Sequence, residues 1–328
     1  MIGLLLALSP AFAQEVNIEI DPRIAAATGI NVAKYEDQMR EEINTNLNLE
    51  DQEAYMVEMA NATAMAMKGM GVDYASNPQR VVTGFSFGSS VNASGAHFGW
   101  GDGITPTGGF SFQMAVMAGI NFGLGASDKS AARRFLLYGD GFVGQRAMEP
   151  FNTTLSNYGA HLQIKLAKPH MTAGMGWGGL DLTSGFEMAT YTMGLTESVP
   201  IDSGTVTWDA DGSYEITSSV TTIPVELSTN VKVPFLSLFG GGAVDINASG
   251  DALSEVRMQG PLTAKVDGKE QVIGQASAVV DAVGLADAVV PRIFVGAQAN
   301  LWKFRLYGQL NVGLNDSFGG HAGARLAI

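Results

Sequence analysis

From residue 81 to the C-terminus, apolar and polar residues alternate along the chain in repeated short stretches. In "VVTGFSFGSSVNA" one face would carry Val81, Phe85, Phe87, Val91 and Ala93, and the other would carry glycine, serine and asparagine. Successive side chains of a β-strand point to opposite faces, so this period of two predicts a strand with one apolar and one polar face.

The same alternation recurs in many later stretches, among them "FSFQMAVMAGINF", "SNYGAHLQIKL", "PVELSTNVKVP", "IFVGAQANL" and "FRLYGQLNVGL". Many of them run about nine to thirteen residues, the length of a tilted transmembrane strand. Turn residues separate them at "EPFN", "KVPFL", "LWKFR" and "NDSFGG". The pattern predicts an antiparallel meander of ten strands. Residues 200–222 and 249–290 are two excursions that would allow twelve or fourteen.

The polar faces favour a membrane barrel over a soluble sandwich. They hold mostly Gly, Ser, Thr, Asn and Gln, with about one charge per strand, whereas a face in bulk water collects Lys and Glu. The apolar faces carry no charge, and aromatic residues lie near their ends. We therefore expect an all-β membrane protein, an up-and-down transmembrane β-barrel of about 10–14 strands with an N-terminal α-helical segment. The outer face would contact outer-membrane lipid.

The start of the chain predicts export. In "MIGLLLALSPAFAQ" a short apolar run precedes the small-x-small pattern Ala11-Phe12-Ala13. We expect a signal peptide at 1–13, a helical plug or oligomerisation segment at 14–78, a barrel at 79–328, and a location in the bacterial outer membrane. If the chain ends on the periplasmic side, the turns at Pro234 and Trp302-Lys303 are periplasmic, and the helical region lies on that side or inside the barrel.

The helical segment is clearest in "NLEDQEAYMVEMANATAMAMKGMG", with Asn48 as the expected N-cap and Gly69 and Gly71 as its stop. A methionine stripe at helical spacing runs along it: Met56, Met59, Met67 and Met70. These adaptable side chains would contact a hydrophobic small-molecule ligand or, as we favour, pack the helix inside the barrel or against a second copy of the chain.

Composition excludes several classes of function. The net charge of −13 argues against a nucleic-acid partner. The chain has no cysteine, which excludes thiol chemistry, and its four histidines form no convincing catalytic arrangement. We expect no enzyme activity, no cofactor and no metal site. "DADGSY" at 209–214 partly matches a calcium loop but lacks the closing acid, and we interpret it as a hairpin tip.

The charged residues on the polar faces are the candidate functional residues: Arg305, Arg325, Lys165, Lys232, Glu226, Glu187 and His161. They would either set the selectivity of a pore or pair with acids of the helical segment and hold a plug in place. The acids expected as partners are Glu36, Asp37, Glu41, Glu42 and Glu50.

The order of helices first and barrel second resembles the long-chain fatty-acid transporter (FadL-like) family, in which the N-terminal helical segment forms a hatch in the lumen. This resemblance implies a channel or transporter for small or hydrophobic solutes, occluded by its N-terminal helices. A second resemblance, to small barrels that form rings in the outer membrane, implies a non-catalytic homo-oligomer that organises lipid.

Overall fold

The computed structural model describes residues 14–23, 31–35, 37–38, 41, 49–75, 81–93, 99–100, 106–123, 130–172, 174–202, 206–266 and 269–328. The segment predicted as a signal peptide and the predicted N-cap Asn48 lie outside these residues. Within them, no helix is long and apolar enough to cross a membrane.

Strands dominate the described chain. In chain order the elements are β1 Gln14–Ile20, α3 Leu49–Ala66, β2 Val81–Asn92, β3 Gly99–Trp100, β4 Pro106–Thr107, β5 Gly109–Asn121, the 3₁₀ turn η2 Ala131–Arg134, β6 Phe135–Met148, β7 Phe151–Ala167, β8 His170–Met171, β9 Gly176–Asp202, β10 Val206–Val233, β11 Leu236–Val266, β12 Lys269–Leu285, β13 Val289–Leu301, β14 Phe304–Gly313 and β15 Ser317–Ala327.

Antiparallel pairing runs round a ring of strands. The order is β11, β10, β9, β7, β6, β5, β2, β15, β14 and β13, and β13 pairs again with β11 through residues 236–246 and 289–299. These ten described strands agree with the lower of the predicted numbers. The predicted turns at Glu149-Pro150, Pro234, Trp302-Lys303 and 314–316 all connect neighbouring strands.

The predicted faces are those of the structure. On the outside of the ring, Phe85 lies opposite Val116 and Phe87 opposite Met114, all of them exposed. At the described outward positions of β2, β5, β13, β14 and β15 there is no charged residue. A protein surface made of uncharged apolar side chains on all of these strands suits lipid and not water.

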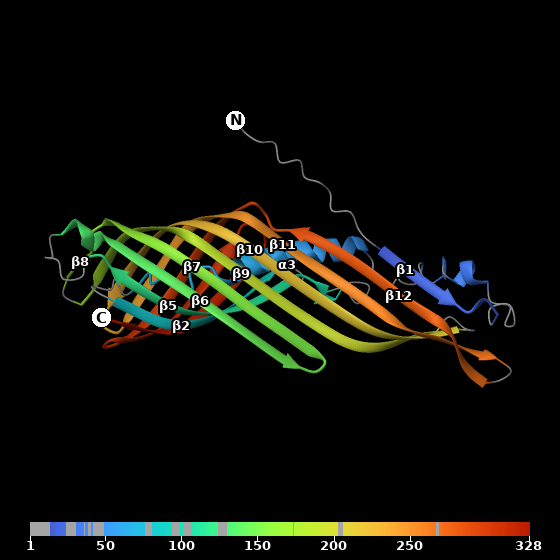
Figure 1. Cartoon of the computed structure of the whole chain (residues 1–328). Helices are drawn as coiled ribbons and strands as arrows, with labels where there is room; N and C mark the ends of the chain where they lie inside the picture. Colours follow the sequence, from blue (N-terminus) through green and yellow to red (C-terminus); the bar gives the residue numbers. More distant parts are fainter. Residues whose placement is uncertain are drawn as a thin grey trace, which may run out of the picture.

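The two ends of the ring differ. The near end carries the C-terminus, the hairpin turns 234–235 and 302–303, and the start of β2, where the Val81 amide donates to the Ile328 carbonyl at 3.2 Å. At the far end β9, β10 and β11 continue beyond the ring, and β12 pairs with the outer part of β11 (Figure 1). β1 adds to the edge of β12, so the first described residues lie at the end opposite the C-terminus.

The far-end sheet of β9, β10, β11, β12 and β1 is the extension. Its inner face is apolar and holds a buried core around Trp208, Leu262 and Ile273. Its outer face is acidic, because Glu215 lies opposite Glu255 and Glu255 opposite Asp281 in the strand register. The outer surface thus changes from apolar on the ring to charged on the extension, which marks where lipid contact would end.

Two predictions about this region were incomplete or wrong. Residues 200–222 and 249–290 were expected to be long external loops or added hairpins. Paired strands occupy most of both: β9 and β10 continue through the first, and in the second β11 pairs with the additional strand β12. The hairpin tip predicted at 209–214 was wrong: these residues lie inside β10 and pair with β9, and residues 211–214 also pair with β11. Hydrogen-bond partners on both edges override the local turn preference of Asp-Gly.

Candidate functional site

Helix α3 lies inside the ring, toward its far end (Figure 1). It contacts β2, β5 and β15 on one side and β10, β11 and β12 on the other. Met56, Met59, Met65, Met67 and Met70 are all buried, as the favoured interpretation of the methionine stripe requires. Ser90 donates a hydrogen bond to the Ala62 carbonyl, and the Asp287 amide donates to Asn61 at 2.9 Å.

Glycines of β5 in the ring and of β12 in the extension make room for the helix. A Cβ at Gly109 would lie 2.1 Å from backbone atoms of Glu58, and one at Gly284 would lie 2.1 Å from the amide nitrogen of Val57. These two strands therefore approach the helix backbone as closely as they do only because neither position has a side chain.

After α3 the chain continues through the ring as the inner segment, residues 67–75. Gly69 has a φ of +81°, the left-handed conformation expected of it after a helix end. A Cβ at Gly71 would lie 2.1 Å from a carboxylate oxygen of Asp140. All residues of the inner segment are buried, so it fills the interior between α3 and the near end.

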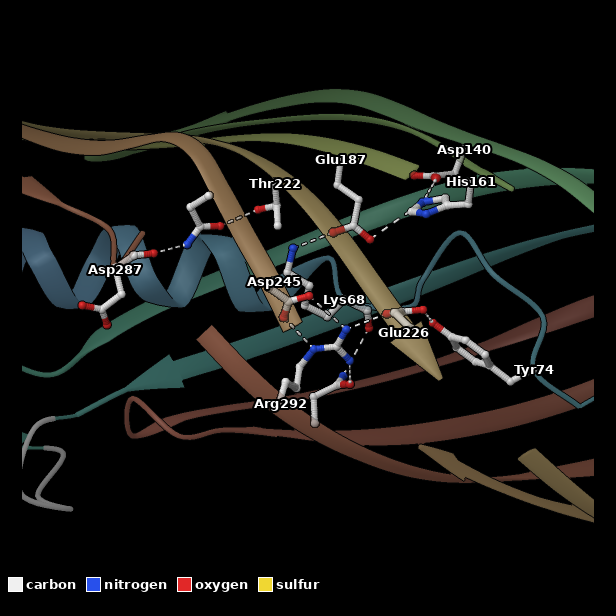
Figure 2. A network of polar contacts seen from close by, with 12 residues as sticks. Lys68, Tyr74, Asp140, His161, Glu187, Thr222, Glu226, Asp245, Asp287 and Arg292 are labelled. Carbon is white, nitrogen blue, oxygen red and sulfur yellow. Dashed lines mark hydrogen bonds and ion pairs between the residues drawn. The ribbon is translucent and has the colours of Figure 1, made fainter. Parts of the chain in front are cut away.

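Lys68 anchors the start of the inner segment. Its Nζ donates to Oε2 of Glu187 at 2.6 Å, and both side chains are almost fully buried (Figure 2). His161 Nε2 lies 3.8 Å from the other oxygen of Glu187 and 3.6 Å from Asp140. The Lys68 carbonyl also accepts a hydrogen bond from Asn311 at 3.2 Å.

A second cluster centres on Arg292 of β13, shown in Figure 2. Its guanidinium donates to Asp245 at 2.8 Å, to Glu226 at 2.6 Å and to Asn311 at 2.8 Å. The other oxygen of Glu226 accepts a hydrogen bond from the hydroxyl of Tyr74, which belongs to the inner segment. One buried cation is thus shared by two carboxylates, and one of these holds the inner segment.

The end of the inner segment is held by Arg325 of β15. Its Nη1 lies 3.2 Å from Asp73 Oδ1, and its Nη2 donates to the Val72 carbonyl at 2.6 Å. Its guanidinium lies over the Tyr307 ring, 3.5 Å from the centroid. Asn230 of β10 donates to the Tyr74 carbonyl at 2.8 Å. Side chains from several strands on different sides of the ring therefore fix residues 68–74.

The structure brings together most of the predicted charged residues. Arg325, Glu226, Glu187 and His161 face inward and are buried around the inner segment. Lys165 also faces inward and pairs with Asp181 at 2.8 Å. Lys232 and Arg305 lie apart from these, where both line a cavity at the near end.

The predicted pairing with acids of the helical region stays a prediction. The acids expected to pair belong to the helical region, but the side chains of Asp37 and Glu41 are exposed, and those of Glu36, Glu42 and Glu50 lie outside the described residues. Among the described residues, Arg325 pairs with Asp73, which follows the helix. Arg305, expected to face the helix acids, instead donates from Nη1 to the carbonyls of Trp302 and Phe304 in its own hairpin.

Sequence reasoning missed Arg292, Asp245, Asp181 and Asp140 on the ring and Lys68 and Asp73 in the inner segment. Asp140, Asp181 and Asp245 were findable, because each is an acid on the polar face of a predicted strand, whereas Arg292 comes directly before the predicted stretch "IFVGAQANL". Lys68 and Asp73 gave only a weak signal: they are the two charged residues between Glu58 and Arg80.

Fold and site together define a class: a ring of antiparallel strands that resembles outer-membrane β-barrels, with a helix and an irregular segment of its own chain inside. A family model described as Lsa36-like matches residues 19–328, and the chain belongs to this family. No curated protein shows significant sequence similarity to it.

Solved structures that resemble the chain do so only weakly. The translocator domain of the autotransporter NalP from Neisseria meningitidis has 10% identity and a TM-score of 0.31, with 94% of this chain and 100% of that chain covered. The CymD monoaromatic hydrocarbon channel has 7% identity and a TM-score of 0.26, covering 82% and 98%. The Ralstonia pickettii toluene transporter TbuX has 9% identity and a TM-score of 0.23, covering 83% and 93%.

Proposed function

We propose that the chain is an outer-membrane channel for small solutes whose lumen is occluded by α3 and the inner segment. The observation that carries this proposal is the set of buried contacts from Lys68, Asp73 and Tyr74 to ring strands. They hold a segment of turns and bends in the interior, where a solute would pass.

The lining of the ring supports a lumen that can hold water. Its buried inward residues are largely polar, including Ser86, Gln113, Asn157, Gln163, Thr183, Gln298 and Gln309. If the inner segment withdrew, water would replace its hydrogen bonds to these groups, whereas an apolar lining would gain nothing from water. The polar lining favours small hydrated solutes over hydrophobic ones.

Ring size limits what would pass. An interior of about eight strands is filled by its own side chains, and about sixteen to eighteen leave a wide aqueous channel. The ring here has ten described strands, so its interior has room for little more than α3 and the inner segment. A channel opened by withdrawal of that chain would be narrow.

Opening requires that charge pairs separate inside the ring. Withdrawal leaves Glu187 without Lys68 and Arg325 without Asp73. Because an unpaired buried charge is very unfavourable, opening must coincide with entry of water. We expect the closed state to dominate and the openings to be brief.

The experiment is single-channel conductance in planar bilayers. The double substitution Lys68→Met with Asp73→Asn removes both ion pairs of the inner segment and is expected to raise the open fraction. Arg257→Gln, which changes an exposed arginine on the extension, is the matched control and should behave as the parent protein. Heat-modifiable gel mobility verifies that each variant is folded. A folded double variant that never conducts would contradict the proposal.

A structural barrel is the second candidate. It is favoured by the extent to which the interior charges are satisfied: Arg292 alone makes hydrogen bonds to three different side chains. In that case the inner chain would be a permanent part of the core, and the apolar outer face would contact lipid or further copies of the chain. Silence of the folded double variant, with a homo-oligomer in mild detergent, is the result this candidate predicts.

A further inference from the structure

A cavity of about 390 Å³ opens at the near end of the ring, beside the last residue of the inner segment, Ala75. Its walls come from three places in the chain. Thr172 and Met175 precede β9, Lys232 lies before the turn between β10 and β11, and Asn300 and Arg305 flank the turn between β13 and β14. Its volume is at the small end of the range for ligand pockets.

The polar groups of the cavity are mainly donors. Lys232 and Arg305 both line it, and there is no carboxylate among its described lining residues. Nη1 of Arg305 is fixed by hairpin carbonyls, while its Nε is buried and makes no hydrogen bond in the described structure. Asn300 and Ser237, also in the lining, are joined by a hydrogen bond of 2.9 Å. Two cations held by the ends of strands thus converge on one small space.

The residues around the opening of this cavity are also positively charged. Arg133 and Arg134 before β6, Lys168 after β7, and Lys303 in the last hairpin all belong to the near end. Among the described residues there, the acids Asp73 and Asp181 are buried and already paired with Arg325 and Lys165. The outer face of the extension at the far end is acidic instead. A concave site ringed by one sign of charge concentrates the opposite sign.

We propose that this cavity binds a small soluble anion through a carboxylate or phosphate group held by Lys232 and Arg305. Lys232 lies on the same face of β10 as the buried Asn230, and Arg305 on the same face of β14 as the buried Tyr307, so the site faces the lumen and not the lipid. Arginine supplies a planar pair of donors and lysine a point charge, a combination suited to either group.

The test is a titration of the full chain in an uncharged, phosphate-free detergent. Isothermal titration calorimetry with inorganic phosphate, and separately with succinate, should show saturable binding at one site. Lys232→Gln and Arg305→Gln are each expected to weaken it at least tenfold. Arg257→Gln removes an arginine from the extension and should leave it unchanged.

Three results would overturn the inference: no saturable binding of either anion, equal weakening by Arg257→Gln, or binding only to phosphate-bearing lipid in vesicles. The last would make the cavity a headgroup site. Because the readout is binding and not conductance, the outcome is independent of whether the barrel forms a channel.

Discussion

Arg292 shows at the scale of one residue why the interior is sensitive to charge. Its side chain is fully buried, and its guanidinium neutralises two carboxylates from neighbouring inward faces. A buried ion pair adds little net stability compared with apolar packing, but loss of one partner leaves a charge that water cannot reach.

Arg292→Gln is therefore expected to destabilise the barrel by about 3–5 kcal/mol. In the heat-modifiability assay, the temperature at which half of the folded band is lost should fall by on the order of 10 °C. Arg257→Gln is the control, because Arg257 is exposed and its partner Glu255 is partly exposed, and it should change stability by less than about 0.5 kcal/mol. The triple change Arg292→Gln, Glu226→Gln and Asp245→Asn should recover part of the loss. No recovery would mean that Arg292 acts by packing and not by charge.

The strands were predictable because their side chains alternate. A face can be read from residue types alone, so the outward and inward sets of β2, β5, β7 and β14 were predicted correctly. The lengths of the strands could not be predicted from the alternation. The strands of the extension continue because each finds a neighbour at the far end, and a neighbour distant in sequence leaves no local signal. The partners Lys68 and Asp73 were missed for the same reason.

The contact between α3 and the ring depends on glycine, and this can be tested with one methyl group. Gly109→Ala would place a Cβ 2.1 Å from the backbone of Glu58, which must move, whereas at Gly139 the nearest atom is 3.8 Å away. We expect Gly109→Ala to loosen α3 and to increase the rate of tryptic cleavage after the buried Lys68 several-fold. The Gly139→Ala variant should be cleaved by trypsin at the rate of the parent protein. Equal rates for the two variants would contradict the described position of the helix.

At the scale of the whole molecule, the N-terminal part of the chain passes through the ring, and the strands that form the ring follow it in sequence. β1 lies at the far end, α3 and the inner segment pass through the interior, and β2 starts at the near end beside the C-terminus. The expectation that the helical region would lie on the C-terminal side or inside the barrel holds for α3, but not for β1. The molecule also carries a basic near end and an acidic extension.

This path predicts that the two ends lie on opposite sides of the membrane. The chain has no cysteine, so single substitutions give clean labelling sites. Asn17→Cys on β1 and Arg134→Cys before β6 are both exposed positions. On intact cells, a membrane-impermeant maleimide should label only one of the two, and Asn17→Cys if the C-terminus is periplasmic. Labelling of both would exclude the described path.

The most direct test of occlusion is to lock the inner chain and measure conductance. A Cβ at Gly319 would lie 2.9 Å from Cγ of Met65, so Met65→Cys with Gly319→Cys would join α3 to β15 by a disulfide. The pair is introduced into the Lys68→Met, Asp73→Asn background and compared before and after reduction. The account predicts silence when the protein is oxidised and openings when it is reduced. Equal conductance in both states, with complete cross-linking verified, would contradict it.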